Sequence, residues 1–253
     1  MDPDLDPLLD QWPYNPSQVN ARFITSADGS PKVQLRLDLG ILQMHLDGRP
    51  DGQRPFGFES WLAYYKNQYN KHLESGNLDN SFSLDSQACQ RLQQEALQFY
   101  HRYLALYELK DWHRVMRDTR HNLQIADFLA HFAENEEHAF SILQFKPYII
   151  MMNCRAADNR LLEQNQHLKA IDCVRSAISE IEQFLSDAEL ELSLEDCPEL
   201  QHLRAWLNEL ESTRPISPLE RMERQLAQAI SNEEYEKAAQ LRDQLARLKK
   251  QST

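Results

Sequence analysis

The chain has 253 residues and a formal net charge of −12, with 6 glycines and 26% charged residues. Its length allows one large or two modest domains, and its composition is typical of a mainly helical protein. Between Glu180 and Glu211, ten acidic residues stand against the single basic residue Arg204, which disfavours direct binding of nucleic acid.

Residues 1–18 are acidic and contain four prolines. We predict a flexible acidic tail here, either mobile in solvent or laid as an arm on the body of the protein. Trp12 and Tyr14 are the side chains that would anchor such an arm.

The segment from Val19 to Asp47 shows the alternation of apolar and polar residues that is typical of half-buried strands. Asp28-Gly29 supplies a turn between two such runs. After Gly40 the apolar residues change parity, which indicates a bend or bulge that divides a long strand or starts a third one. The sequence therefore predicts a small N-terminal β-hairpin or meander.

A turn-rich loop follows at Asp47 to Gly52. Arg49, Asp51 and Arg54 form a candidate secondary site for an anion or a partner, and the alternative that we favour is a solvated loop. The loop lacks the lysine and hydroxyl of a P-loop and the glycine spacing of a dinucleotide site. We therefore expect no nucleotide and no other cofactor.

Aromatic residues recur at helical spacing from Phe56 to Leu73, which predicts a helix. Such a stripe favours core packing over base stacking, because few basic residues lie nearby. The hairpin and this aromatic helix together form a predicted segment over 19–82.

The remainder, 83–212, has a helical pattern almost throughout. Asp111 suits an N-cap, and Pro198 suits a first helical turn. A weak internal sequence repeat suggests stacked, tetratricopeptide-like helical hairpins. The predicted helices cover 84–109, 111–133, 137–163 (bent or restarted near Pro147), 167–186 and 198–211.

No group of residues reaches the pattern of a catalytic or metal site. His131, Glu134 and His138 resemble a metal set, but we interpret their segment as an acidic turn, and we predict no metal. The four cysteines are far apart and form no C-x-x-C pair. Without an apolar run of membrane-spanning length or a leader pattern, the chain is predicted to be cytoplasmic with reduced thiols.

The last stretch, residues 213–253, is predicted to hold a linker and two short helices folded back on each other. Ser217 with Glu220, and Ser231 with Glu234, have the spacing of capping boxes at two helix starts. A hairpin this small buries little apolar area, so we expect it to complete its core on a partner. The predicted partner-binding residues are Leu226, Ile230, Tyr235, Ala238, Ala239, Leu241, Arg242 and Leu245.

The spacing from Leu226 through Ala229-Ile230 and Glu233-Glu234-Tyr235-Glu236 to Ala238-Ala239 and Leu241-Arg242-Asp243 closely resembles the UVR motif. That motif occurs in the excinuclease subunits UvrB and UvrC, in ClpC-type chaperones and in McsA-type activators of protein arginine kinase. The resemblance implies an antiparallel helical hairpin that binds another protein, which can be a second UVR hairpin. The zinc-binding cysteine pairs of the arginine-kinase activators are missing here.

A second resemblance lies in the N-terminal half, from Gln34 to Met44 and from Asp47 to Gly52. This part is similar to uncharacterised planctomycete-type proteins that carry a UVR motif, and it implies no activity.

These observations predict an α+β protein, mainly α, that acts as a non-enzymatic adaptor. The resemblance implies an excinuclease subunit, a ClpC-type chaperone or an arginine-phosphorylating kinase as its partner. One alternative is an enzyme of unknown reaction, with its site between Gly40 and Phe58 and the hairpin as a regulatory dock. A weaker alternative is a nucleic-acid-binding accessory protein of DNA repair.

Overall fold

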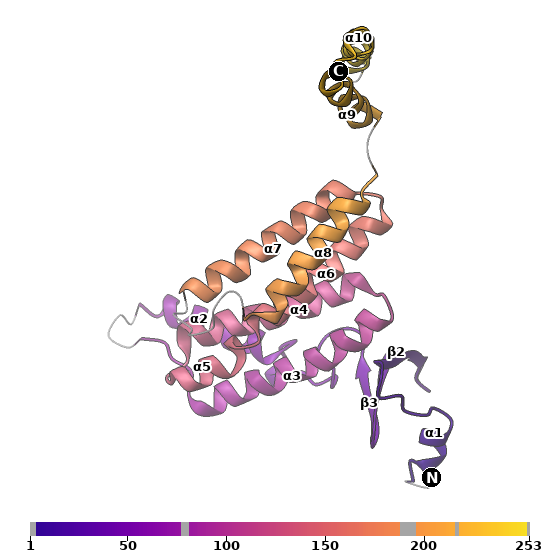
Figure 1. Cartoon of the computed structure of the whole chain (residues 1–253). Helices are drawn as coiled ribbons and strands as arrows, with labels where there is room; N and C mark the ends of the chain where they lie inside the picture. Colours follow the sequence, from indigo (N-terminus) through magenta and orange to yellow (C-terminus); the bar gives the residue numbers. More distant parts are fainter. Residues whose placement is uncertain (1–3, 77–80, 188–195, 216–217, 252–253) are drawn as a thin grey trace. The chain divides into compact units, whose positions relative to one another are not determined.

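The computed structural model describes residues 4–76, 81–187, 196–215 and 218–251 (Figure 1). The fold is α+β and mainly helical, with a small N-terminal sheet and a C-terminal helical pair, as the sequence predicts. The chain forms two compact units, Met1–Asn208 and Glu209–Thr253. The capping pair of Ser217 and Glu220 lies outside the residues and side chains that are described.

The sheet is an antiparallel meander of β1 (Asn20–Thr25), β2 (Pro31–Leu37) and β3 (Gly40–His45), in that order. Gly40 pairs with Leu37 and opens β3, which explains the change of parity in the sequence. Leu37 is 37% exposed although its alternation predicts burial, because it lies where β2 turns into β3.

The helices predicted between residues 84 and 211 begin and end close to the predicted bounds, while the short helix α1 (Asp6–Asp10) was not predicted. Asp85 and Asp111 act as N-caps, since each carboxylate accepts a hydrogen bond from the backbone N–H three residues ahead. The predicted segment 137–163 restarts near Pro147 as two helices. The helices are α1 (Asp6–Asp10), α2 (Trp61–Glu74), α3 (Ser86–Glu108), α4 (Trp112–Phe132), α5 (Glu136–Leu143), α6 (Lys146–Glu163), α7 (His167–Asp187) and α8 (Pro198–Thr213).

Helices α3, α4, α6 and α7 pack as successive neighbours, and α5 lies against α3 and α4 (Figure 1). Trp206 of α8 donates from Nε1 to Asp158 of α6 at 2.5 Å, and Arg204 pairs with Glu182 of α7. The body is therefore built from stacked helical hairpins, and their identity as tetratricopeptide-like repeats stays a prediction.

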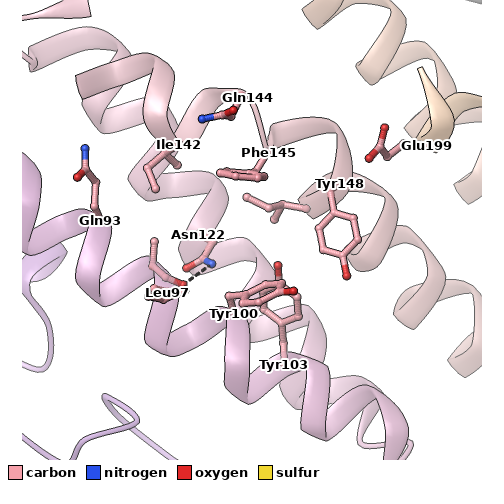
Figure 2. Close-up of a pocket in the computed structure, with 12 residues that line it drawn as sticks. Gln93, Leu97, Tyr100, Tyr103, Asn122, Ile142, Gln144, Phe145, Tyr148 and Glu199 are labelled. Atoms are coloured by element: carbon pink, nitrogen blue, oxygen red, sulfur yellow. Dashed lines mark hydrogen bonds between the residues drawn. The ribbon is translucent and has the colours of Figure 1, made fainter. Parts of the chain in front are cut away.

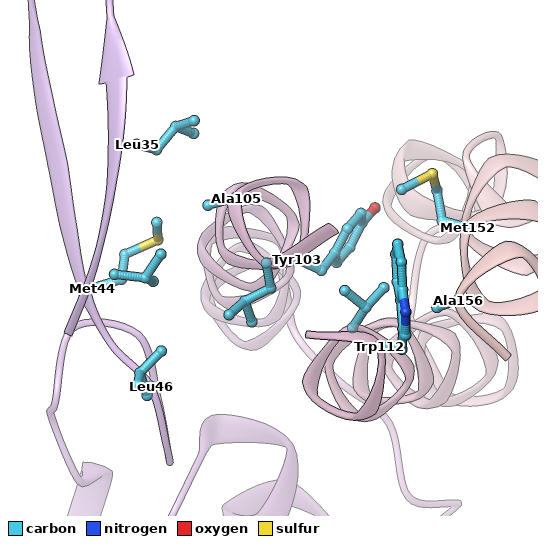
Figure 3. Close-up of a cluster of buried hydrophobic side chains, with 11 residues drawn as sticks. Leu35, Met44, Leu46, Tyr103, Ala105, Trp112, Met152 and Ala156 are labelled. Atoms are coloured by element: carbon cyan, nitrogen blue, oxygen red, sulfur yellow. The ribbon is translucent and has the colours of Figure 1, made fainter. Parts of the chain in front are cut away.

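Helix α3 lies at the centre of the larger apolar core (Figure 3). On one side of it, Leu35, Met44 and Leu46 come from the sheet and the segment after β3, and on the other side Trp112 and Met152 come from α4 and α6. The sheet is thus packed on the same helix that begins the helical stack.

The aromatic helix begins at Trp61, five residues later than the sequence predicts. Ser60 caps it by accepting a hydrogen bond from the Ala63 amide, and Pro55–Gly57 forms a separate 3₁₀ turn, η1. Within that turn Phe56 has φ of 50°, a value outside a right-handed helix. The start of the helix is therefore set by its cap and not by the aromatic spacing.

Trp12 and Tyr14, the predicted anchors of the N-terminal segment, both contact the sheet. The Arg22 guanidinium lies 4.1 Å from the centre of the Trp12 ring, and Arg36 donates from Nε to the Trp12 carbonyl at 2.9 Å. Arg36 also lies over Tyr14 at 5.9 Å. Cation–π contacts of this kind lay the segment on the sheet as an arm.

A buried ion pair joins the sheet to the helical stack. Arg102 of α3 and Asp118 of α4 are both 0% exposed, and two parallel hydrogen bonds of 2.6 and 2.8 Å link them. Nη1 of Arg102 also donates to the carbonyls of His45 and Gly48, at 2.8 Å each. The guanidinium therefore binds α4 and the end of β3 together.

A second buried carboxylate, Glu95 of α3, holds the start of α2. It is 0% exposed and accepts hydrogen bonds from the backbone amides of Trp61 and Leu62, at 2.7 and 3.2 Å. A carboxylate at a helix N-terminus satisfies amides that have no partner within the helix. His121 and Arg49 approach the same carboxylate at 3.0 and 3.6 Å.

Arg102→Met should lower the free energy of unfolding by about 3–5 kcal/mol, because it leaves the Asp118 carboxylate buried beside Arg117 alone. Removing both charges in Arg102→Met/Asp118→Leu should cost less than the single substitution. Chemical denaturation followed by circular dichroism measures both.

The matched control is Arg204→Met, which breaks an ion pair whose side chains are 45% and 37% exposed. It should cost about 0–1 kcal/mol. An equal loss for Arg102→Met and Arg204→Met would show that the buried pair does not support the fold.

Candidate functional site

The candidate site is the C-terminal hairpin, formed by α9 (Pro218–Ser231) and α10 (Tyr235–Gln251), which pack on each other. Ala229, Ala238 and Leu245 are buried in the seam between the two helices. The two small alanines, one on each helix, let the backbones approach closely. Met222, Leu226 and Leu241 are half-buried beside them.

The predicted partner-binding residues divide into two groups. Ala238 and Leu245 lie within the seam and Leu226 and Leu241 lie at its edge, so these four hold the hairpin itself together. Ile230 and Tyr235 are 55% and 70% exposed. Ala239 and Arg242 are exposed as well.

The connection between the helices is a Schellman motif. The Glu234 amide donates to the Ala229 carbonyl at 2.8 Å, and the Glu233 amide donates to the Ile230 carbonyl at 3.0 Å. Glu233 has φ of 59°, the left-handed conformation that usually selects glycine. The predicted capping box at Ser231 and Glu234 is therefore wrong, because backbone bonds of the preceding helix end set the geometry of the turn.

Exposed apolar side chains gather where the helices connect. Ile230 is the penultimate residue of α9 and Tyr235 is the first residue of α10. Four residues separate the two positions in sequence, with the Schellman turn between them. Since tyrosine is a frequent anchor of protein interfaces, this connecting end offers, among the described side chains of the hairpin, apolar surface that another protein would cover.

Charged side chains lie on the exposed surface of the hairpin. A hydrogen bond and the charge of Lys237, which lies 2.8 Å from Glu234 in an ion pair, lower the pKa of the Glu234 carboxyl. Arg242 binds its neighbour Asp243 at 3.1 Å on the exposed surface. Charges at the edge of an interface steer association and partner choice more than they hold a complex together.

The candidate secondary site, Arg49 with Asp51 and Arg54, is occupied by contacts within the fold at Arg49. Arg49 is 6% exposed and binds Asp51 through two hydrogen bonds of 2.7 and 3.1 Å, in addition to its contact with buried Glu95. Although partial burial opposes it, hydrogen bonds from the Gln53 amide, Gln98 and Arg49 lower the pKa of Asp51. The Arg49 guanidinium is thus used inside the fold, while Arg54 is exposed.

Comparison with protein families gives one match. The family model of the UVR (UvrB/uvrC) motif matches residues 217–251, the stretch that holds α9 and α10. The chain carries a UVR motif. Comparisons with curated proteins and with solved structures gave no match. None of the described helices is long and apolar enough to cross a membrane.

A UVR motif generally mediates interaction between proteins, so the match agrees with the exposed apolar end of the hairpin. The motif occupies only the last part of the chain, and the sheet and helical body lie outside the matched residues. The family pattern therefore bears on the hairpin alone.

Glu233→Gly should stabilise the hairpin by about 1 kcal/mol, because glycine adopts a positive φ without the steric cost that glutamate bears. Hydrogen exchange of α9 and α10 amides measures the change, which should appear as slower exchange. Glu236→Gly in the first turn of α10 is the control, and it should speed exchange, since glycine weakens a helix. Faster exchange in Glu233→Gly would contradict this explanation of the turn.

Proposed function

We propose that the protein is a non-enzymatic adaptor that recruits a protein partner through its UVR hairpin. The observation that carries the proposal is the exposed apolar pair Ile230 and Tyr235 at the connecting end of a hairpin that matches the UVR motif. The seam is already filled by Ala229, Ala238 and Leu245, so the two helices do not need a partner to cover these residues.

The proposed partners are those that the motif implies: an excinuclease subunit, a ClpC-type chaperone, an arginine-phosphorylating protein kinase, or a second UVR hairpin. We propose that Ile230 and Tyr235 enter an apolar pocket of the partner, and that Arg242 and the acidic residues near the turn select among partners. We also propose a cytoplasmic location, a compartment in which cysteines such as Cys154 and Cys173, whose Sγ atoms lie 4.0 Å apart, are kept as thiols.

Capture by the full-length protein tests this proposal. Wild-type and variant proteins are titrated with a purified member of each partner class, and affinity capture from native lysate with mass spectrometry extends the test. The double variant Ile230→Ala/Tyr235→Ala should weaken binding at least about 30-fold, the loss expected when interface anchors are truncated.

Two controls separate binding from folding. Leu168→Ala truncates a leucine of the first unit that is 63% exposed, and it should bind as the wild type does. Ala238→Glu places a carboxylate in the closed seam, so it should melt the hairpin and abolish binding together. Wild-type affinity in a folded double variant would place recognition elsewhere in the chain.

A further inference from the structure

Two of the four cysteines face each other where α6 packs against α7. Sγ of Cys154 lies 4.0 Å from Sγ of Cys173, a separation at which one sulfur can hydrogen-bond with the other. The Cys154 thiol also donates to the Cys173 carbonyl at 3.7 Å. The two residues are 19 positions apart in sequence, so the packing of the two helices is what brings their sulfurs together.

The buried face of α7 positions the second of these thiols. Ala170 and Ala177 lie three residues before and four residues after Cys173, and both are buried. Residues at these spacings share one face of a helix, so Cys173 lies on the face that packs against α6. The small alanine side chains on this face let the two helices approach closely.

The two thiols differ in exposure and in acidity. Cys154 is buried, whereas Cys173 is half-buried and has contact with solvent. When Cys173 ionises, a hydrogen bond from the Cys154 thiol lowers the pKa of Cys173, although burial and the nearby Asp158 oppose this shift. The same interaction, together with burial, raises the pKa of Cys154, which therefore keeps its proton. Since the thiolate is the nucleophilic form, Cys173 is the sulfur that reacts first with an oxidant.

We propose that Cys154 and Cys173 are an oxidation site, at which hydrogen peroxide converts the two thiols into a disulfide between α6 and α7. A disulfide joins its sulfurs at about 2.05 Å, so the two sulfurs must approach each other by about 2 Å. In a reducing compartment such a bond is transient, because cellular thiols reduce it again. The site lies in the first unit, so the inference does not depend on the partner of the UVR hairpin.

The reaction balances with hydrogen peroxide as the only oxidant. The Cys173 thiolate attacks one peroxide oxygen, so an S–O bond forms and the O–O bond breaks. The departing hydroxide takes up the proton that Cys173 released and becomes water, which leaves Cys173 as a sulfenic acid. The Cys154 sulfur then attacks Sγ of Cys173, so the S–S bond forms as the S–O bond breaks. The second hydroxide leaves as water with the Cys154 proton, and the two thiols have together lost two electrons.

The other two cysteines are internal controls, because each thiol lies beside an oxygen atom. Sγ of Cys89 donates to the Leu84 carbonyl at 3.5 Å, and Sγ of Cys197 donates to the Glu199 carboxylate at 3.4 Å. Burial raises the pKa of both thiols. Glu199 of α8 and Tyr148 of α6 line a cavity of about 650 Å³ (Figure 2). Peroxide in this cavity comes near Cys197, so the resistance of that thiol would show that a second thiol is needed in addition to access.

Peptide mapping of the full chain tests the proposal. The protein is treated with hydrogen peroxide, and the remaining thiols are blocked with iodoacetamide in denaturant. Each cysteine lies in a tryptic peptide of its own, so mass spectrometry identifies which two are joined. The wild type should give one linked pair, Cys154 with Cys173, and dithiothreitol should restore both thiols. Cys89 and Cys197 should remain blocked by iodoacetamide.

Three variants test the role of each thiol. Cys154→Ser keeps the attacking thiol but removes its partner, so dimedone, a reagent for sulfenic acids, should label Cys173. Cys173→Ser leaves the buried thiol alone, and peroxide should oxidise Cys154 there at least about tenfold more slowly than it oxidises Cys173 in Cys154→Ser. Cys197→Ser is the matched control and should form the disulfide as the wild type does. Circular dichroism confirms that the variants are folded.

The wild-type map decides even if a serine variant does not fold. The proposal is overturned if peroxide produces no bond between Cys154 and Cys173, or if all four cysteines are oxidised at equal rates. A disulfide between two copies of the chain in place of the internal one, visible as a dimer on a non-reducing gel, would also overturn it.

Discussion

The Arg102 guanidinium is the contact on which the first unit depends. It binds Asp118 in the buried α3–α4 interface, and it donates hydrogen bonds to the carbonyls of His45 and Gly48 at the end of the sheet. Seven residues earlier on α3, Glu95 binds the first amides of α2. A charge that is removed from water must be fully paired, so these contacts specify one arrangement of sheet, α2 and helical stack.

Different contacts hold the two units of the chain. Polar contacts and the apolar core hold the first unit, while the hairpin closes its own seam with Ala229, Ala238 and Leu245 and leaves Ile230 and Tyr235 exposed. A partner that binds the connecting end of the hairpin need not disturb the core.

The sequence predicted the fold class, the meander and the order of the helices, because apolar periodicity and N-caps such as Asp111 are local signals. It did not predict that the aromatic helix begins at Trp61 with Ser60 as its N-cap, since the aromatic spacing continues upstream of the cap. The ion pair of Arg102 and Asp118 could not be predicted from the sequence, because two charged residues on different helices meet only in the folded chain. At the site, the motif indicated the hairpin, but Glu233 is not a residue that marks a left-handed turn, so the Schellman motif and the exposure of Tyr235 required the structure.

The central claim is that recognition resides at the connecting end of the UVR hairpin. Hydrogen-exchange mass spectrometry of the full-length protein, with and without a captured partner, tests it most directly. The account predicts that the partner slows exchange in peptides covering residues 226–240, while peptides from α3, α4 and α6 remain unchanged. Protection confined to the first unit, with no change in α9 or α10, would contradict it.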